Sequence, residues 1–520
     1  MKRSAWRDAM IRCVVVTGAI VATTAVAVTA VPAAGSASPG SAAAADQPQR
    51  TIAWAPCQED PTAECGTLAL PIDWAEPDGP TFDLAVARRA ATNQSTRIGA
   101  LLLNPGGPGL SGIDNYIFTG GDRLSAEIRS RFDLVGFDPR GTQRSNPIIC
   151  PGRTWVSGPY LYPASQADFE TVVGHNQQLA ADCRERTGPL FDHVDTLSTV
   201  HDLDALRAAL GESTLTFYGA SYGTLIGQQY AEVYGDRVRA MVLDGTMDHS
   251  LGTRDFLVTE SASLHEALTG FAAWCDRTDA CPLRTRGTQA VFAELKASAE
   301  RGELISRTGT LIKPYDLVVR VLRASAGPAE DWVSVAAWLH DLTVAQPTDP
   351  VAQPTDPVAM PPTALAADGD DDIAPAGVAA PFCQDWDLPI DDYDQYSDLL
   401  RQMAEASPEM GPSRLALGRA IACLGWPGTV NNPQHPLRVT SGPTLLLVNS
   451  RYDPATGYNW ATNAASQLAD RAVLLTYEGP GHVLYPKSAC IADSIDAYLI
   501  DRTVPASGSR CQLELPATAG

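Results

Sequence analysis

Five residues, Gly219-Ala220-Ser221-Tyr222-Gly223, constrain the fold of this chain more than any other segment. A short apolar run at 215–218 precedes them, and a helical pattern over 225–234 follows. A G-x-S-x-G pattern between a strand and a helix is typical of a nucleophile elbow, a sharp turn on which the serine hydroxyl projects. Glycines suit such a turn because a side chain beside the serine would crowd it. An ordinary strand-to-helix turn is the alternative, so other groups in the chain are needed to distinguish the two.

Apolar runs and helical patterns alternate on both sides of this turn. Continuous apolar runs, which suit strands buried on both faces, cover 98–104, 132–138 and 238–243. A helix is predicted over 198–210, where apolar side chains recur on one face until Gly211. This alternation predicts an α/β fold with a mostly parallel sheet flanked by helices. Short alternating segments within 46–95 predict an antiparallel strand pair at the edge of that sheet.

The pattern changes after Asp248 and returns to strands near the end of the chain. Residues 250–438 are mainly helical in texture, whereas strand-like runs return at 443–449 and 472–477. We therefore predict one core in two parts, 46–249 and 439–520, with a large helical insertion late in the sheet. An insertion beyond strand ends would cover the crevice where open α/β sheets bind ligands, so we call residues 250–438 the lid.

A heptapeptide repeat lies inside the lid. The sequence VAQPTDP occurs at 344–350 and again at 351–357, and the whole segment 344–380 is rich in proline, alanine and aspartate. This composition is typical of a flexible acidic loop and favours that interpretation over a binding motif.

The chain begins with the pattern of an export signal. Four basic residues stand before position 13, an apolar stretch covers 13–31, and small residues continue to Ala45. We predict a signal peptide over 1–45 that is cleaved before Asp46, and hence a secreted protein. Cleavage after Ala37 and an uncleaved membrane anchor are the alternatives.

The charge of the chain is strongly negative. The formal net charge is −22, and it becomes −25 once residues 1–45, with four basic residues and one acidic residue, are removed. An acidic surface repels phosphate backbones, which argues against nucleic acid as a partner. It attracts cationic groups and suits a secreted enzyme without a stable membrane partner.

The cysteine count predicts disulfides. Ten of the eleven cysteines follow the signal, and an even count in an exported protein is typical of a disulfide framework. Spacing alone leaves the connectivity open, and sequential pairing would give Cys57–Cys65, Cys150–Cys183, Cys275–Cys281, Cys383–Cys423 and Cys490–Cys511. No C-x-x-C occurs and the histidines lack metal-ligand spacing, so we predict neither a metal site nor a cofactor.

Two residues after later strands complete a candidate catalytic triad with Ser221. A serine hydroxyl needs a histidine base, which a carboxylate orients, and in the α/β-hydrolase fold the order is Ser, acid, His. Asp453 follows the run at 443–449, and His482 follows the run at 472–477. All three would lie at the carboxyl ends of parallel strands. An aspartate before proline is often only a turn former, and Asp244 after the run at 238–243 is the alternative acid.

A glycine-rich loop supplies candidate oxyanion donors. Acyl transfer needs two backbone N–H groups aimed at the developing oxyanion. The residue after the nucleophile, Tyr222, would give one, and the loop Asn104–Gly109 after an earlier strand would give the other. Within that loop we favour the N–H of Gly107, then that of Gly106. A tight turn without a catalytic role is the alternative.

The chain resembles the secreted tripeptidyl aminopeptidases of actinobacteria, in the proline-iminopeptidase branch of the α/β hydrolases. The matching segments, from about residue 55 to the end, include the Asp453-Pro454 and Gly481-His482 pairs and the tail from Cys490 to Cys511. The longer motifs are NPGGPGLSG at 104–112, GFDPRGTQRS at 136–145, DLDALRAALGE at 202–212, GASYGT at 219–224 and VLDGTMD at 242–248. The chain departs from its relatives at Pro105, usually His, and at Leu110, often Gly, and its lid matches less closely.

This resemblance implies release of short peptides, tripeptides among them, from peptide substrates with a free N-terminus. A carboxylate in or near the lid would hold the ammonium, and Asp385 and Glu232 are the candidates, each with an ordinary solvated acid as the alternative. A carboxylesterase or lipase would use the same triad, and a non-catalytic protein on a hydrolase scaffold would keep the fold.

Overall fold

The computed structural model describes residues 50–118, 121–156, 162–279, 281–344, 372–374, 379–485 and 487–513. The predicted signal peptide and nearly all of the doubled heptapeptide lie outside these residues. Within them, no helix combines the length and apolarity needed to cross a membrane.

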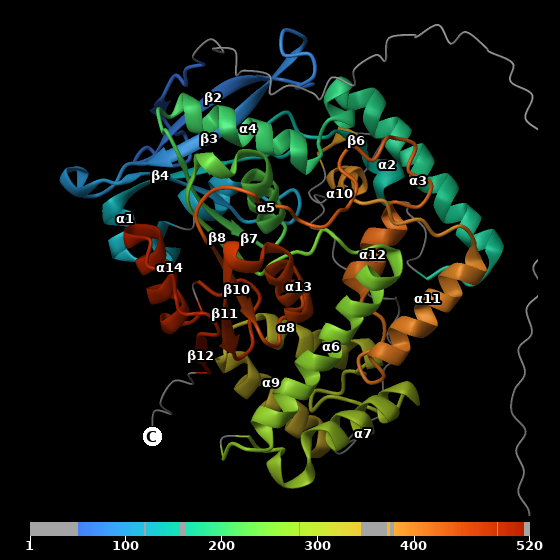
Figure 1. The fold of residues 1–520 in the computed structure, drawn as a ribbon. Coiled ribbons are helices and arrows are strands. Elements are labelled where there is room, and N and C mark those ends of the chain that lie inside the picture. The colour runs from blue at the N-terminus through green and yellow to red at the C-terminus, as the bar shows by residue number, and fades with distance from the viewer. Residues whose placement is uncertain are drawn as a thin grey trace, which may run out of the picture. The chain divides into compact units, whose positions relative to one another are not determined.

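The core is a ten-stranded sheet, mostly parallel, as the sequence predicts (Figure 1). Three N-terminal strands pair antiparallel at one edge, the innermost of them also with its neighbour in the middle of the sheet, and the other seven strands of this sheet pair with one another in parallel. In spatial order the strands are β1 (Ala55–Pro56), β2 (Glu64–Pro71), β3 (Thr81–Arg89), β5 (Phe132–Phe137), β4 (Gly99–Asn104), β7 (Leu215–Ala220), β8 (Val238–Asp244), β10 (Leu445–Ser450), β11 (Ala472–Glu478) and β12 (Arg510–Gln512).

Helices cover both faces of this sheet. Every residue of β4, β7 and β10 is buried, because apolar side chains alternate toward two layers of helices. One layer consists of α3 (Gln166–Thr187), α4 (Thr196–Ala209), α5 (Gly223–Tyr234) and α13 (Tyr458–Leu468). The other includes α1 (Ala126–Arg131) and α14 (Ala489–Asp501). A wholly buried ion pair, in which Arg140 donates to Asp202 at 2.6 and 2.7 Å, ties the loop after β5 to α4.

The chain between β8 and β10 is mainly helical (Figure 1). The α-helices among its described residues are α6 (Thr253–Cys275), α7 (Thr288–Glu300), α8 (Pro314–Ala326), α9 (Glu330–Val344), α10 (Ala380–Asp385), α11 (Tyr393–Ala406) and α12 (Arg414–Ala422). Residues Asp372–Ile373 form β9, which pairs antiparallel with β6 (Cys150–Pro151) ahead of α2 (Gly152–Val156).

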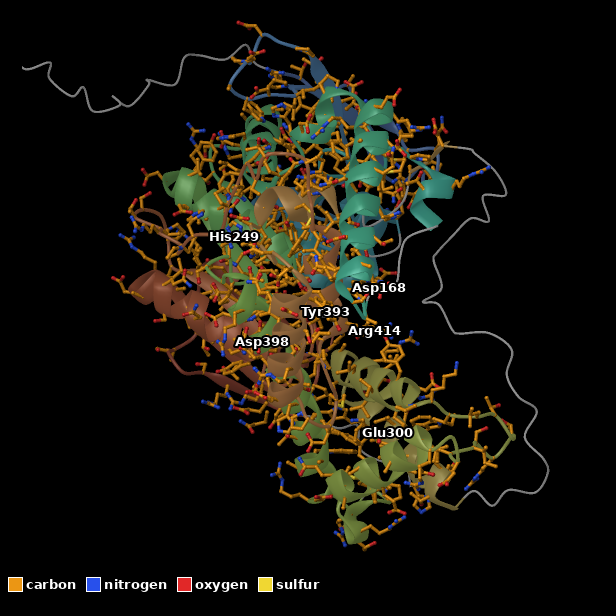
Figure 2. The ribbon with its side chains drawn as sticks, turned by 90° about the vertical axis from the view of Figure 1, so that its right-hand side faces the viewer. Asp168, His249, Glu300, Tyr393, Asp398 and Arg414 are labelled. Carbon is orange, nitrogen blue, oxygen red and sulfur yellow. A yellow bond between two sulfur atoms is a disulfide. The ribbon has the colours of Figure 1, made fainter. Side chains whose placement is uncertain are left out.

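Helix α6 joins the two parts of the lid, since its side chains enter two separate apolar clusters. Leu264 and Phe271 pack with α7, α8 and α9, whereas Phe256 packs with α10, α11 and α12. The second cluster also contains Phe169 of α3, so the lid packs onto the core. Figure 2 shows Asp168 of α3 near Tyr393 of α11, where the N–H of Tyr393 donates to the side chain of Gln166 at 2.9 Å.

Five disulfides join the ten cysteines in sequential order. Cys490–Cys511 ties α14 to the last strand, and Cys57–Cys65 closes the antiparallel edge. Two bonds lie inside the lid: Cys275–Cys281 follows α6, and Cys383–Cys423 links α10 to the end of α12.

Candidate active site

Ser221 occupies a strained turn between β7 and α5. Its φ is 53°, in the left-handed region that non-glycine residues rarely adopt. The two flanking glycines are required by space: a Cβ at Gly219 would lie 2.4 Å from the carbonyl oxygen of Gly223, and a Cβ at Gly223 would lie 2.7 Å from Asn104 Oδ1. The N–H of Ser221 donates to the carbonyl of Asp244 at 2.8 Å, which fixes the turn against β8.

His482 is held by a buried carboxylate. Its Nδ1 lies 2.9 Å from Oδ2 and 3.1 Å from Oδ1 of Asp453, which is 1% exposed. Three donors fix that carboxylate: the N–H groups of Ala455 and Thr456 donate to Oδ1 at 2.8 and 3.0 Å, and the Thr456 hydroxyl donates to Oδ2 at 2.9 Å. The arrangement orients the imidazole with Nδ1 toward the acid, as a histidine base requires.

The turn that carries His482 rests on the lid. The N–H groups of Gly481 and His482 donate to the carbonyls of Ser325 and Ala326, at the end of α8, at 2.7 and 3.0 Å. Lys487 donates to the carbonyls of both Ala326 and His482. The position of the candidate base therefore depends on the lid as well as on β11.

Asp244, the alternative acid, binds the next part of the same turn. It accepts hydrogen bonds from the N–H of Leu484 at 2.8 Å, from the N–H of Tyr485 at 3.0 Å and from the Tyr218 hydroxyl at 2.7 Å. Burial raises the pKa of Asp244 above its usual range. Nδ1 of His482 faces Asp453 and not Asp244. Asp244 instead holds the backbone just after the histidine, through the N–H groups of Leu484 and Tyr485.

Of the three candidate oxyanion donors, the structure leaves two. The N–H of Gly106 already donates to Asn104 Oδ1 at 2.9 Å, so in this structure it is not free to receive an oxyanion as predicted. Among the described residues, nothing accepts a hydrogen bond from the N–H of Gly107. Gly107 and Tyr222 both line the cavity that contains Ser221. Gly106 is needed for space instead, since its Cβ would lie 2.6 Å from the nitrogen of Tyr222.

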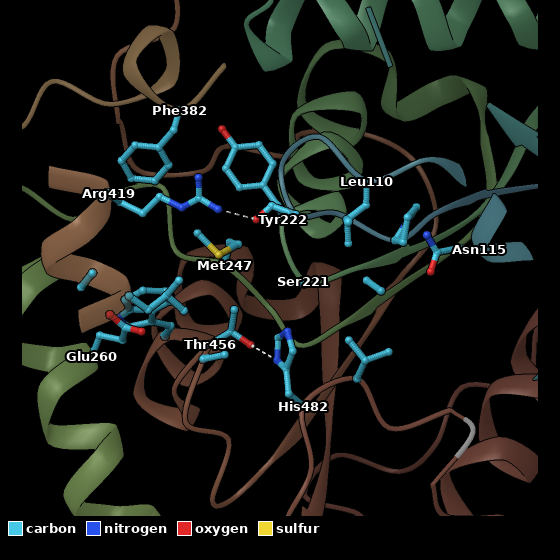
Figure 3. Close-up of a pocket in the computed structure, with 18 of the residues that line it drawn as sticks. Leu110, Asn115, Ser221, Tyr222, Met247, Glu260, Phe382, Arg419, Thr456 and His482 are labelled. Carbon is cyan, nitrogen blue, oxygen red and sulfur yellow. Dashed lines mark hydrogen bonds between the residues drawn. The ribbon is translucent and has the colours of Figure 1, made fainter. Parts of the chain in front are cut away.

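One cavity of about 500 Å³ brings these groups together (Figure 3). Ser221 and His482 both line it, beneath the lid. Much of its wall is apolar and comes from both the core and the lid, including Met247, Phe256, Phe382, Leu415 and Trp460. Within the described residues, no three His, Cys, Asp or Glu side chains converge as metal ligands would.

Glu260 of α6 is an ionisable residue in this cavity that the sequence patterns above did not identify. Its side chain is 1% exposed, and burial raises its pKa to about 8. The hydroxyl of Ser413 donates to Oε2 at 2.9 Å, whereas Oε1 has no hydrogen-bond partner among the described residues. Figure 3 shows Glu260 and Asn115 on opposite sides of Ser221. The available signal was a lone acid on the buried face of α6, one turn from Phe256 and Leu264.

The two predicted ammonium ligands lie outside the cavity. Asp385 is fully buried, and its four donors are Tyr222 Oη, the N–H and hydroxyl of Thr196, and Asn432 Nδ2. Glu232 accepts from the N–H of Arg438 at 3.0 Å and pairs with His435 at 2.9 Å. Both carboxylates are occupied by protein groups, so in this structure neither is placed to bind a substrate ammonium as predicted.

Comparison with known proteins places the chain among hydrolases. Residues 99–315 match the family described as "alpha/beta hydrolase fold", and residues 410–511 match the family described as "TAP-like protein". The chain is 31% identical to serine protease Hip1 of Mycobacterium tuberculosis, over 98% of this chain and 99% of that protein.

Two further relatives carry different names. The chain is 30% identical to carboxylesterase B of Mycobacterium tuberculosis, over 86% of each. It is 29% identical to tripeptidyl aminopeptidase of Streptomyces lividans, over 90% of this chain and 88% of that protein. Each similarity extends over the core and the lid alike.

Proposed function

The chain belongs to the TAP-like family of α/β hydrolases, and we propose that it is a secreted exopeptidase acting on free amino ends. Its fold and relatives make it a serine peptidase. The proposed products are short peptides, tripeptides first among them, which is the activity named for its Streptomyces relative.

The proposed chemistry is acyl transfer to water. The hydroxyl of Ser221 attacks the scissile carbonyl while His482 takes its proton, and His482 then protonates the departing amine. Asp453 stabilises the imidazolium that forms, and the N–H groups of Gly107 and Tyr222 receive the oxyanion. Water, activated by the same histidine, then hydrolyses the acyl-enzyme.

Glu260 is the observation that carries the exopeptidase proposal. A buried carboxyl with one unpaired oxygen, in the cavity that holds Ser221 and His482, is suited to a cationic partner, which would stabilise its ionised form. The ammonium of a peptide N-terminus is such a cation, with an unperturbed pKa of about 8. A substrate without that charge would leave Glu260 unpaired or protonated.

The size of the cavity supports short products. About 500 Å³ lies within the range of small-ligand sites, ~300–1,000 Å³, so the space suits a short acyl segment and excludes an extended chain. The distance between the Glu260 carboxylate, which would hold the amino terminus, and Ser221 would then set the number of residues released.

The test compares one peptide with and without its amino charge. We expect kcat/KM for a tripeptidyl p-nitroanilide to fall about 100-fold or more when the amine is acetylated, because the buried carboxylate loses its partner. Mass spectrometry of an unblocked decapeptide should show stepwise release of short N-terminal peptides. Glu260→Gln should reduce the preference for the free amine, and Ser221→Ala should abolish turnover. Equal cleavage of the acetylated anilide would overturn the proposal.

A carboxylesterase is the second candidate, favoured by the apolar wall that Met247, Phe256, Phe382 and Trp460 provide. An acyl chain without an amine would pack against that wall and leave Glu260 protonated. Higher kcat/KM for p-nitrophenyl butyrate than for the free-amine anilide, unchanged in Glu260→Gln, would favour this activity.

The five disulfides support secretion, since such bonds persist in oxidising compartments. Expression of the full chain, followed by N-terminal sequencing of protein in the medium, tests this part. A mature protein that begins at Asp46 is the expected result, and retention in the membrane fraction would contradict it.

A further inference from the structure

Both remaining oxyanion donors are held from the lid. Arg419 of α12 donates from Nη2 to the carbonyl of Gly107 at 3.0 Å, and Asp385 of α10 accepts from the hydroxyl of Tyr222. We propose that Arg419 and Asp385 are positioning residues that fix the two oxyanion donors, and that the Cys383–Cys423 disulfide joins them into one brace. The inference rests on the proposed hydrolytic mechanism and goes beyond it.

Gly107 needs an external anchor because glycine does not fix its own N–H direction. Its φ is 113°, a conformation that other residues rarely adopt, and the glycine before it is in the same region. Its carbonyl is the only atom of Gly107 that a described side chain binds, and the donor is a charged guanidinium. A charge-assisted bond to that carbonyl fixes the peptide group that follows Gly107 and so restricts movement of the residue, its N–H included, within the loop.

Tyr222 is anchored through its side chain. The hydroxyl bonds to Asp385, and the ring packs 6.4 Å from Phe382 and 6.0 Å from Trp386, centroid to centroid. The other donors to Asp385 come from Thr196 and Asn432, so the carboxylate is itself fixed by the core and the lid. Rotation of Tyr222, and of the N–H next to Ser221, is thereby limited from outside α5.

The two anchors form one unit. On α10, Phe382 precedes Cys383 directly and Asp385 follows it by two residues, and the guanidinium of Arg419 lies 5.8 Å from the ring centroid of Phe382. Cys383 bonds to Cys423, four residues beyond Arg419. A shift of either helix would therefore move both anchors together.

Tyr222→Phe and Thr196→Val form a matched pair that tests the first anchor. Each removes one hydroxyl that donates to Oδ2 of Asp385, but only Tyr222 carries an oxyanion donor. We expect Tyr222→Phe to lower kcat on a free-amine tripeptidyl anilide by about 10- to 100-fold with KM within about 2-fold, less than outright removal of a donor. Thr196→Val should leave kcat within about 2-fold.

Arg419→Met tests the second anchor, and Arg419→Lys provides the conservative variant. We expect Arg419→Met to lower kcat by a similar factor and Arg419→Lys to recover part of it, since an ammonium can still donate to the carbonyl. A tripeptidyl aldehyde forms an adduct that carries an oxyanion. Both Arg419→Met and Tyr222→Phe should therefore weaken binding of this inhibitor by the same factor by which they lower kcat. Affinity for the free tripeptide product should stay unchanged.

The disulfide is tested by two serine double variants. Cys383→Ser with Cys423→Ser should lower kcat and aldehyde affinity, whereas Cys275→Ser with Cys281→Ser, in the same lid but away from the cavity, should not. Equal losses in the two double variants, or equal losses in Tyr222→Phe and Thr196→Val, would show general destabilisation and overturn the brace. A wild-type protein that hydrolyses no ester or anilide would refute the proposed function instead, whereas an active wild type with an unaffected Tyr222→Phe would refute only the brace.

Discussion

Nδ1 of His482 lies 2.9 Å from Oδ2 of Asp453, whose carboxylate is almost completely buried and accepts three further hydrogen bonds. In Asp453→Asn, the N–H groups of Ala455 and Thr456 would keep the amide oxygen on their side. The amide NH₂ would then face Nδ1 and force the wrong histidine tautomer. We expect kcat to fall by about 10⁴-fold, measured on a free-amine tripeptidyl anilide. A loss below about 10-fold would remove Asp453 from the mechanism.

Asp244→Asn should behave differently, although Asp244 is just as buried. Its carboxylate serves backbone donors of Leu484 and Tyr485, so the amide would lose an acceptor and lower stability by about 1–3 kcal/mol. The expected signature is a lower unfolding midpoint with a much smaller loss of kcat than in Asp453→Asn. The two variants, measured side by side by calorimetry and turnover, separate an acid that orients the base from one that holds its loop.

Gly106→Ala should impair the site by crowding the backbone on both sides of Ser221, including the N–H of Tyr222. The added Cβ would lie 2.5 Å from the carbonyl of Ala220 and 2.6 Å from the nitrogen of Tyr222, and the φ of 84° is itself unfavourable for alanine. Backbone atoms on both sides cannot yield as a flexible side chain would. We expect strongly reduced kcat together with lower thermal stability. Gly211→Ala is a suitable control, since it has a similar φ of 77° and open space around its Cβ.

The pH dependence of the amine preference should report Glu260. Its pKa of about 8 means that the carboxyl is mostly protonated at pH 6, when the substrate ammonium is fully charged. Nearby Asp453 raises this pKa further, whereas Arg419 opposes the rise. The ratio of kcat/KM for the free-amine anilide to that for its acetylated form should therefore rise from pH 6 toward 8. Above about 8 the ratio should fall as the substrate amine loses its proton.

Using the ratio cancels the ionisation of the base, which both substrates share. In Glu260→Gln the ratio should stay low and flat across the range. A wild-type ratio that does not change between pH 6 and 8 would contradict the ammonium-binding role of this residue.

Stability should change with pH through the same residue. The folded chain keeps the Glu260 proton up to about pH 8, whereas the unfolded chain releases it near 4.5, so the folded state binds more protons between these values. The stability that the neutral carboxyl provides is complete below pH 4.5 and is lost as pH rises through 8. The free energy of unfolding of Glu260→Gln, relative to that of the wild type, should thus increase by a few kcal/mol between pH 5 and pH 9. Unfolding midpoints of both proteins at the two pH values check this, and parallel curves would contradict it.

Local patterns were enough to predict the central sheet. Short continuous apolar runs bounded by turns rarely form anything but buried strands. Parallel strands form at all six such runs, at 98–104, 132–138, 215–218, 238–243, 443–449 and 472–477. The strand β12 was missed because three residues, Arg510–Gln512, carry no periodic signal of their own. Their pairing depends on β11 and on the Cys490–Cys511 bond, which are distant in sequence.

In the site, too, residues that follow strands could be predicted from local patterns, whereas residues of the lid could not. Ser221, Asp453 and His482 each follow a recognisable strand, and the structure brings Asp453 and His482 into hydrogen-bond contact; their catalytic roles stay predictions until the variants are measured. Asp385 and Glu260 are both lid acids, and sequence alone could not tell which enters the cavity. That depends on whether the carboxylate meets Thr196 and Tyr222 or meets Ser413, and such contacts arise only when helices pack.

The contact of α8 with the Gly481-His482 turn restricts how the protein can admit a peptide. If the lid swung away as a rigid flap, it would displace His482 and both oxyanion donors. The catalytic groups would then lose their arrangement as the substrate binds. Under the proposed exopeptidase activity, substrates would instead enter an assembled cavity with one chain end first. A folded protein would then be excluded by its bulk, and only loose chain ends would be cleaved. Such a peptidase could be released among intact proteins without destroying them.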